Sequence, residues 1–411
     1  MGVLEIFVQI QHLLLNLHEK CCIMLLINLR GYMIINRQRF LSEIEKGFKA
    51  CPIVALLGPR QCGKTTLAHE YIKNTSLSSC FFDMEDIEQL DLLTQTPKYL
   101  EKVTEDLIVI DEVQLLDQIF PYLRVFIDNT DKKLLLLGSA SRDLITKTSE
   151  TLAGRIDYTY VTPFNMHEVK NRNSLWIRGG FPRSFLAEDE ETSFRWRQSY
   201  ITTYLERDIP QIAPGMNPAL VRQVWMMLTH YHGNIVNYTD IGKSLGISDM
   251  SIKRYIQLLE GTFMVRCLQP WFENISKRQV KSQKVYIRDS GILHTLLGVK
   301  YEDYHSNPKI GASWEGFAME QVIAYFNVRP EDCYFWNIQS IGEIDLLIIK
   351  DGKKIAFEFK FASVPSVSKR THQLLDILKP DKFYIVTPGN ESYIIDNDIK
   401  VRGLCEAGVS F

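Results

Sequence analysis

The chain has 411 residues, enough for two to four domains at roughly 100–200 residues each. Hydrophobic residues make up 45% and charged residues 23%, as in ordinary globular proteins, and the formal net charge is −2. This charge excludes nucleic-acid binding through an overall positive field, so such binding would need a local basic patch. The 8 cysteines include no C-x-x-C pair. Neither a zinc site nor a disulfide framework is indicated, and reduced thiols in the cytoplasm are expected.

Residues 1–32 form an apolar segment that polar side chains such as Glu5, His12 and Lys20 interrupt. Its longest apolar run, 21–27, is far short of the ~20 residues that a membrane-spanning helix needs, so no membrane contact is expected. The segment also lacks the basic start and cleavage site of a signal peptide. We expect either an amphipathic extension or upstream sequence included by a wrong start, with Met33 as the natural start.

Residues 58–65 read G-P-R-Q-C-G-K-T, a complete phosphate-binding loop of the G-x-x-x-x-G-K-[ST] type. The apolar run 53–57 before it predicts a buried strand, and the residues after it begin a helical pattern. In such a loop the backbone N–H groups and the helix N-terminus converge on phosphate oxygens. Lys64 would reach the β- and γ-phosphates of ATP, and the Thr65 hydroxyl would hold Mg²⁺. The expected ATP-binding residues are Gly58, Pro59, Arg60, Gln61, Cys62, Gly63, Lys64, Thr65 and Thr66.

Further strands are predicted after the loop at 80–83, 107–112, 134–139 and 157–161, with helical patterns between them. The sheet should therefore be mostly parallel, with both faces covered. Ligands of such sheets lie at the carboxyl ends of the strands, where Asp111, Glu112 and Ser139 fall.

Phosphoryl-transfer chemistry suggests a role for each of these side chains. Asp111 is expected to hold Mg²⁺, Glu112 to polarise the attacking water, and Ser139 to sense the γ-phosphate or position that water. The alternative for Asp111 and Glu112 is a simple helix cap, which the apolar strand and the upstream loop disfavour. The alternative for Ser139, an ordinary turn serine, stays open. Arg142 and Arg155 are candidate cations for the transition state, with surface salt bridges as the alternative.

The motifs G-P-R-Q-C-G-K-T-T-L-A at 58–68, L-I-V-I-D-E-V-Q at 107–114, L-L-G-S-A-S-R at 136–142 and L-A-G-R-I at 152–156 resemble those of a known family. They are similar to the prokaryotic AAA-type P-loop ATPases that commonly carry a C-terminal domain of unknown function. G-G-F-P at 179–182 and Y-L-E-R-D-I at 204–209 are typical of that family's middle region. The resemblance runs from about residue 33 to the C-terminus. It implies an ATPase core over 33–165 and a helical lid over 166–225.

Residues in the lid could contact the nucleotide. Arg207 and Asp208 are candidates for this contact, with a solvated, salt-bridged face as the alternative. Cys62 stands where the family usually has a small apolar residue, a mild change that should not prevent nucleotide binding.

Residues 239–259 have the spacing of a helix-turn-helix unit, in which a short helix ends at Gly246 and a second helix follows. The resemblance implies a winged-helix module over 226–290. Lys253 and Arg254 fall on the exposed face of the second helix, where DNA readers place contacts. The alternative is a structural module with a solvated charged face. A basic stretch that could bind a DNA or RNA backbone contains Lys277, Arg278, Lys281, Lys284 and Arg288.

Near the C-terminus, two strand patterns at 343–349 and 354–360 flank Asp351-Gly352, which is a strong hairpin signal. This turn would place Asp345 opposite Glu358, and Glu343 opposite Lys360, on one charged face. The other face would be apolar, with Ile344, Leu346, Ile348, Ile355, Phe357 and Phe359.

Directly opposed carboxylates repel each other, and Mg²⁺ between Asp345 and Glu358 would remove that cost. Lys360 could activate a water, so these three residues are candidate catalytic residues. The D-x12-E-x-K pattern resembles the PD-(D/E)XK nuclease core, which implies a mixed α/β nuclease-like domain over 291–411. Such cores take a further metal ligand from a preceding helix, where Glu315 is expected and Glu320 is the lesser candidate. The alternative is a polar sheet face without a metal.

The sequence thus predicts an α/β protein that binds and hydrolyses ATP with Mg²⁺. The ATP state would control a nuclease-like domain that acts on or binds nucleic acid. One alternative is a nucleotide-switched interaction protein whose nuclease-like domain is an inactive docking platform. Another is a nuclease whose loop binds ATP with negligible turnover. A homo-oligomer is expected only by analogy with ring-forming ATPases.

Overall fold

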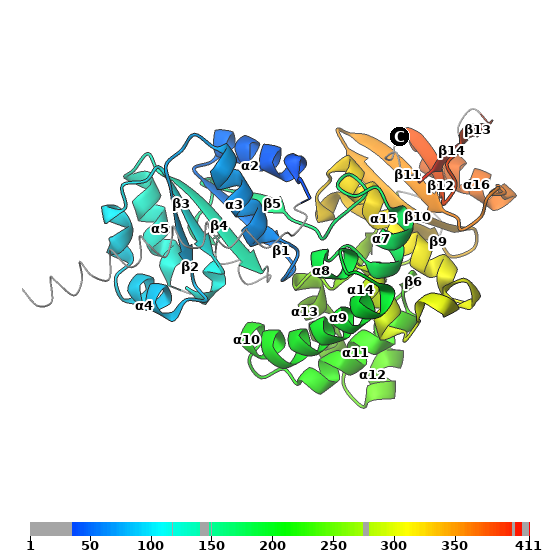
Figure 1. Ribbon diagram of the computed structural model, residues 1–411. Helices are drawn as coiled ribbons and strands as arrows, with labels where there is room; N and C mark the ends of the chain where they lie inside the picture. The colour runs from blue at the N-terminus through cyan, green and yellow to red at the C-terminus, as the bar shows by residue number, and fades with distance from the viewer. Residues whose placement is uncertain are drawn as a thin grey trace, which may run out of the picture.

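The structure, a computed structural model, describes residues 35–116, 118–139, 148, 150–273, 279–396, 399–404 and 411. The extension 1–32, Met33, Arg142, Lys277 and Arg278 lie outside these residues. Figure 1 shows two sheets, one in the blue and cyan N-terminal part and one in the orange and red C-terminal part. Green helices of the middle of the chain gather below the second sheet. In the described part of the chain, no helix is long and apolar enough to cross a membrane.

The first sheet has five strands in the order β2-β3-β4-β1-β5, all parallel, which confirms the expected α/β arrangement. Its central strands are buried along their length because they carry uninterrupted apolar runs. The strands are β1 (Ile53–Gly58), β2 (Ser79–Asp83), β3 (Leu107–Asp111), β4 (Lys133–Ser139) and β5 (Ile156–Tyr160).

Helices cover both faces of this sheet. Alternate residues of β1 point to opposite faces, so that Val54 and Leu56 belong to one core and Ala55 and Leu57 to the other. The helices are α2 (Gln38–Ala50), α3 (Lys64–Asn74), α4 (Ile87–Gln95) and α5 (Ile119–Asp128), with short 3₁₀ turns η2 (Pro97–Lys102) and η3 (Val113–Leu115).

Most helices of the middle of the chain pack around one core that includes Trp225, whereas Leu175 and Trp176 belong to the core of the C-terminal region. The expected helix-turn-helix is present: α12 (Tyr238–Leu245) ends at Gly246, whose φ is +67°, and Ser248 caps α13 (Asp249–Gly261). The other helical elements are α7 (Arg172–Arg178), α8 (Pro182–Phe185), α9 (Glu190–Thr203), the π-helical turn η4 (Tyr204–Asp208), α10 (Ile209–Ile212), α11 (Pro218–His230) and α14 (Ser290–Leu296).

The second sheet has nine strands in the order β13-β14-β12-β11-β10-β9-β7-β8-β6. Its strands are β6 (Asn234–Ile235), β7 (Val265–Pro270), β8 (Lys284–Ile287), β9 (Cys333–Ile338), β10 (Gly342–Lys350), β11 (Lys353–Phe359), β12 (Lys382–Thr387), β13 (Ser392–Asp396) and β14 (Ile399–Gly403). A short parallel pairing of β7 with β9 joins the strands of the middle region to those of the C-terminal region. The helical elements here are η5 (Tyr301–Ser306), α15 (Ile310–Phe326), η6 (Pro330–Asp332) and α16 (Lys369–Leu378). The regions expected as separate domains, 226–290 and 291–411, therefore share one sheet.

The hairpin of β10 and β11 has the expected register, from Leu346 opposite Phe357 to Lys350 opposite Lys353. Both turn residues, Asp351 and Gly352, have positive φ, as a tight hairpin requires.

The prediction of the apolar face of this hairpin is wrong for one residue, Ile344. Trp336 and Tyr334 of β9 pair with Ile344 and Leu347 of β10, so β10 carries one extra residue between these pairs. The bulge turns Ile344 into the core that contains Leu347 and Trp336, away from the core that contains Leu346.

Candidate functional site

The phosphate-binding loop is a tight turn between β1 and α3. A Cβ atom at Gly58 would lie 2.2 Å from the carbonyl oxygen of Val161, so only glycine fits at the end of β1. Gly63 has a φ of +97° directly before α3, a conformation that glycine adopts without strain. The loop therefore presents its backbone at a helix N-terminus, the arrangement that binds phosphates.

The expected magnesium ligands lie together. The Thr65 hydroxyl donates to Oδ2 of Asp111 at 2.6 Å, and Nζ of Lys64 donates to the carbonyl oxygens of Gly58 and Pro59 at 3.1 and 3.0 Å. Burial raises the pKa of Asp111 to about 6, although the hydrogen bond from Thr65 opposes the shift. A hydroxyl and a carboxylate at this spacing are oxygen donors that fit Mg²⁺ beside bound phosphates. Thr66 is exposed on the first turn of α3.

Glu112 and Ser139 are joined by a residue that the sequence analysis left without a role. Nε2 of Gln114 donates to a carboxylate oxygen of Glu112 and, at 3.0 Å, to the hydroxyl of Ser139. Glu112 has a φ of +51°, the left-handed conformation that aims its side chain from the end of β3. The only sequence signal for Gln114 was its place in the motif 107–114.

Arg37, for which the sequence predicted no role either, holds the backbone of the phosphate-binding loop. Its buried guanidinium donates to the carbonyl oxygens of Cys62 at 3.0 Å and Thr162 at 2.7 Å, and forms an ion pair with Glu168. Arg37 precedes the loop by a whole helix and strand, so no local motif pointed to it.

We expect Arg37→Ala to lower ATP affinity by roughly tenfold, because hydrogen bonds from a charged group contribute on the order of 1.5–3 kcal/mol and these hold the loop backbone. A titration with a fluorescent ATP analogue measures the affinity, and thermal unfolding shows whether the variant is folded. Arg195→Ala, which removes an exposed arginine of α9, is the control and should bind normally. Unchanged affinity in folded Arg37→Ala would contradict this role.

Arg60 connects the loop to the middle region. Its guanidinium pairs with Asp208 of η4, donates to Glu85 at 3.0 Å and lies 3.9 Å from a carboxylate oxygen of Glu112. Asp208 is buried and so does not lie on a solvated face, whereas Arg207 is an exposed partner of Glu85. A cavity here is lined by Gly58, Pro59, Arg60, Ser139, Tyr200, Tyr204, Asp208, Ile212, Thr262 and Met264.

Arg155 lies far from the phosphate-binding loop of its own chain. It directly precedes β5, and its carbonyl oxygen accepts from Ile53 at the start of β1. Because the strands are parallel, this is the edge of the sheet opposite to Gly58. Its guanidinium pairs with Asp128 at 2.6 and 2.8 Å, so the salt-bridge alternative describes it.

In the C-terminal region, three acids surround a lysine that was not expected there. Nζ of Lys284, from β8, lies 2.9 Å from Glu315 of α15 and 3.2 and 3.1 Å from Glu343 and Asp345 of β10. We call Glu315, Glu343 and Asp345 the carboxylate cluster. Burial and the nearby Asp345 raise the pKa of Glu315 to about 7. Burial would lower the pKa of Lys284, but Tyr286 and the cluster raise it above its usual value.

The other candidate ligands lie in different ion pairs. Glu358 pairs with Lys360 at 2.5 Å, and Glu320 pairs with Arg266 at 2.5 Å. Within the residues that the structure places, no three His, Cys, Asp or Glu side chains are arranged to hold a metal. Since the ammonium of Lys284 already lies among the carboxylates, the arrangement does not fit a divalent cation.

The basic stretch also differs from the expectation. Lys284 and Arg288 point into the protein and pair with acids, so neither is available to a nucleic-acid backbone. Lys281 is exposed, as are Lys253 and Arg254 of α13. Charge alone in the sequence did not distinguish the buried from the exposed cations.

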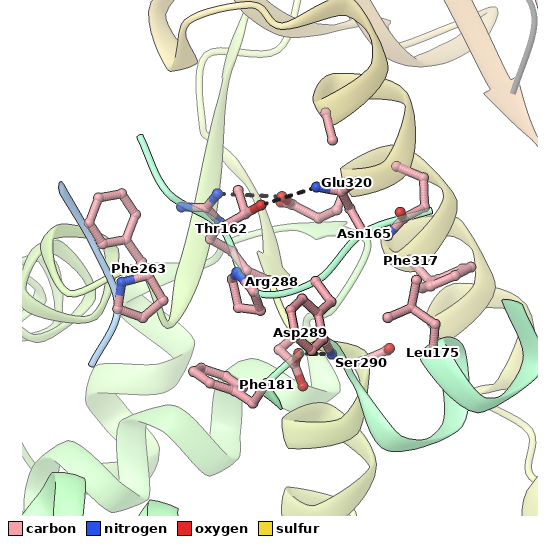
Figure 2. Close-up of a pocket in the computed structure, with 16 residues that line it drawn as sticks. Thr162, Asn165, Leu175, Phe181, Phe263, Arg288, Asp289, Ser290, Phe317 and Glu320 are labelled. Atoms are coloured by element: carbon pink, nitrogen blue, oxygen red, sulfur yellow. Dashed lines mark hydrogen bonds and ion pairs between the residues drawn. The ribbon is translucent and has the colours of Figure 1, made fainter. Parts of the chain in front are cut away.

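Arg288 and Glu320 face each other beside a cavity where several regions meet. Figure 2 shows this pair at one side of the cavity and Phe181, Leu175 and Phe317 at the others. Its empty volume is about 570 Å³, including the part open to solvent. The lining comes from the phosphate-binding loop, the segment after β5, the middle helices and α15.

Comparison with known families matches three parts of the chain. Residues 51–170 match the AAA domain, residues 169–303 a domain of unknown function (DUF8612), and residues 310–405 a domain of unknown function (DUF4143).

Two mycobacterial proteins are similar over most of the chain: "Uncharacterized protein Mb2031c" of Mycobacterium bovis and "Uncharacterized protein Rv2008c" of Mycobacterium tuberculosis. Each is 38% identical over 372 residues, which are 89% of this chain and 83% of the relative. Among solved structures, the Walker-type ATPase PABY2304 of Pyrococcus abyssi is 14% identical, with a TM-score of 0.48 over 64% of this chain and 96% of that chain. The Aeropyrum pernix ORC1 protein in complex with DNA is 10% identical, with a TM-score of 0.33 over 66% of this chain and 95% of that chain.

The AAA match covers the phosphate-binding loop and the ends of β3 and β4, where Thr65, Asp111, Glu112 and Ser139 lie.

Proposed function

Because the chain belongs to the family of the mycobacterial proteins Mb2031c and Rv2008c and carries an AAA domain, we propose that it is a Mg²⁺-dependent ATP-binding and ATP-hydrolysing protein. The match to the AAA domain supports ATP binding and hydrolysis in general. The observation that carries the specific proposal is the 2.6 Å contact between Thr65 and Asp111, beside the buried Lys64.

Each residue has a chemical task in this proposal. The loop N–H groups bind the phosphates, and Lys64 exchanges its two carbonyl partners for β- and γ-phosphate oxygens. Thr65 and Asp111 hold Mg²⁺, which neutralises charge on the phosphates when bound. Glu112, oriented by Gln114, accepts a proton from the attacking water.

The proposal includes control of the middle region by the ATP state. Arg60 contacts both Glu112 and Asp208, so one side chain links the hydrolytic carboxylate to η4. Phosphate oxygens compete with Asp208 for the same guanidinium, because both are anions. A π-helical turn such as η4 is often found at functional positions.

We expect Asp208→Asn to change ATP affinity by less than about tenfold and to abolish the response of residues 204–212 to ATP, because the neutral amide no longer pairs with Arg60. Amide hydrogen exchange with and without ATP measures that response. The matched control is Glu206→Gln, which neutralises an exposed acid of the same turn and should respond as the unaltered protein does. An ATP response that persists in Asp208→Asn would refute this link.

For the C-terminal region, the sequence suggested either a nuclease-like domain controlled by ATP or an inactive docking domain. The position of Lys284 in the carboxylate cluster supports the docking form. The exposed Lys253 and Arg254 on α13 support DNA or RNA binding by a winged-helix module. A cytoplasmic location and a homo-oligomer stay predictions from the sequence.

The deciding experiment measures ATP turnover by the purified protein with Mg²⁺, alone and with DNA or RNA. Turnover that EDTA abolishes supports the proposal, and no turnover under any condition overturns it. Stimulation that is lost in Lys253→Ala/Arg254→Ala would support nucleic acid as the partner. Turnover that nucleic acid leaves unchanged would favour a protein partner of the docking domain.

A further inference from the structure

We propose that Lys284 is the resident cation of the carboxylate cluster and takes the place that a divalent metal ion would occupy in a metal-dependent nuclease. A side chain of the same sheet then keeps the divalent cation from binding, so the C-terminal region cannot perform metal-dependent cleavage. This inference deepens the docking form of the proposed function, and its test needs no ATP turnover.

The ammonium group of Lys284 is fully engaged. It has three N–H donors, and one carboxylate from each of Glu315, Glu343 and Asp345 lies within 3.2 Å of the nitrogen. The side chain is 1% exposed, so water does not replace these partners. The three donors of the ammonium group are thus matched by three carboxyl acceptors, and every bond is charge-assisted because the ammonium itself is charged.

The carboxylates are held in place by neutral donors as well. The hydroxyl of Tyr286 donates to Glu315 at 2.5 Å, the side-chain amide of Asn337 to Glu343 at 3.1 Å, and the backbone N–H of Phe359 to Asp345 at 3.0 Å. The cluster is therefore built around its present geometry by residues of β8, β9 and β11.

The backbone of Lys284 is fixed too. β8 lies between two neighbours, and Lys284 is paired with Leu268 of β7 and with Ile235 of β6. The strand pairing fixes the Cα position of Lys284, and the three carboxylates hold its ammonium group.

A metal ion and the ammonium cannot share the cluster. Both are cations, and both need the same carboxylate oxygens. The residues expected to form a cleavage site lie in two different ion pairs, Glu358 with Lys360 and Asp345 with Lys284. Removal of the Lys284 charge would leave three carboxylates close together without their common cation, those of Asp345 and Glu315 largely buried and that of Glu343 partly exposed. Such carboxylates are the oxygen ligands that a divalent cation takes.

The test is a Mn²⁺ titration followed by electron paramagnetic resonance, on nucleotide-free protein that carries Thr65→Ala to remove the metal ligand of the phosphate-binding loop. In this background, Lys284→Met should bind one Mn²⁺ at least roughly tenfold more tightly than the parent protein, because three carboxylates then lack a counter-ion. Mn²⁺ should also raise the melting temperature of Lys284→Met and not that of the parent. The matched control is Lys281→Met, which removes an exposed lysine near β8 and should gain nothing.

Adding Asp345→Asn to Lys284→Met should abolish the gained binding, which assigns it to the cluster. A folded Lys284→Met that gains no Mn²⁺ site would overturn the proposal. If Lys284→Met does not fold, the same Mn²⁺ titration is made on the Thr65→Ala parent with and without Asp345→Asn. Tight Mn²⁺ binding that Asp345→Asn abolishes in the parent would mean that a metal, not Lys284, occupies the cluster, whereas no such binding supports the proposal. None of these outcomes depends on ATP hydrolysis, so a failure of the proposed ATPase activity and a failure of this inference are distinguishable.

Discussion

Glu112→Gln is expected to lower ATP turnover by roughly 10²–10⁴-fold, because a positioned general base contributes about that much to a reaction. The amide cannot accept the proton of the attacking water, while the loop, Lys64 and Thr65 keep the groups that bind phosphate. ATP affinity should therefore stay within roughly tenfold of the unaltered protein. Phosphate release at saturating ATP and Mg²⁺, together with a binding titration, measures both quantities.

The control for this prediction is Glu105→Gln, which neutralises an acid two residues before the amino end of β3. It lies at the opposite edge of the sheet from Glu112 and should leave turnover unchanged. If Glu112→Gln retains turnover within about threefold of the unaltered protein, the role of general base belongs to another group.

Glu320→Ala is expected to lower the free energy of unfolding by about 3–5 kcal/mol, the usual cost of leaving buried charges without their partner. Glu320 receives two hydrogen bonds from Arg266, at 2.5 and 2.9 Å, and lies 3.5 Å from Arg288. Burial would raise the pKa of Glu320, but the two arginines lower it below the ordinary value of 4.5. The carboxylate is therefore charged at neutral pH, and its removal leaves Arg266 and Arg288 without this partner. Arg288 is the one that lines the cavity of Figure 2.

Urea denaturation at pH 7 measures this effect, with Glu191→Ala as the control, since Glu191 is exposed at the start of α9 and should change the free energy by less than about 0.5 kcal/mol. The pH dependence gives a second check. A lowered folded-state pKa means that the contribution of Glu320 is present above the unfolded value and is lost as pH falls through the folded value. The difference between Glu320→Ala and the unaltered protein should therefore shrink in acid. A difference that stays constant there would show that the charge of Glu320 is not what stabilises the fold.

Much of the nucleotide site was predictable because its signals are local. An apolar run followed by G-x-x-x-x-G-K-T defines a strand, a turn and a helix within about twenty residues. Apolar runs that end in Asp111 and Ser139 placed those residues at the carboxyl edge of a parallel sheet, because all strands of such a sheet end on the same side.

The contacts of single charged residues were not predictable in the same way. Arg37 donates to the loop at Cys62 and also to Thr162, which is more than a hundred residues away in the sequence. Arg60 pairs with Asp208 of the middle region. Such pairs depend on how distant segments pack, and nothing near either residue in the sequence encodes the partner.

The sequence by itself determined the elements: five parallel strands, the phosphate-binding loop, the helix-turn-helix and the hairpin at Asp351-Gly352. Periodicity and turn chemistry act within a few residues, so they can be read along the chain. Only the tertiary structure decided which charges are buried, where the bulge after Ile344 redirects β10, and that Lys284 lies among three acids. The free energy of a charge depends on what surrounds it in space, and packing between distant segments sets those surroundings.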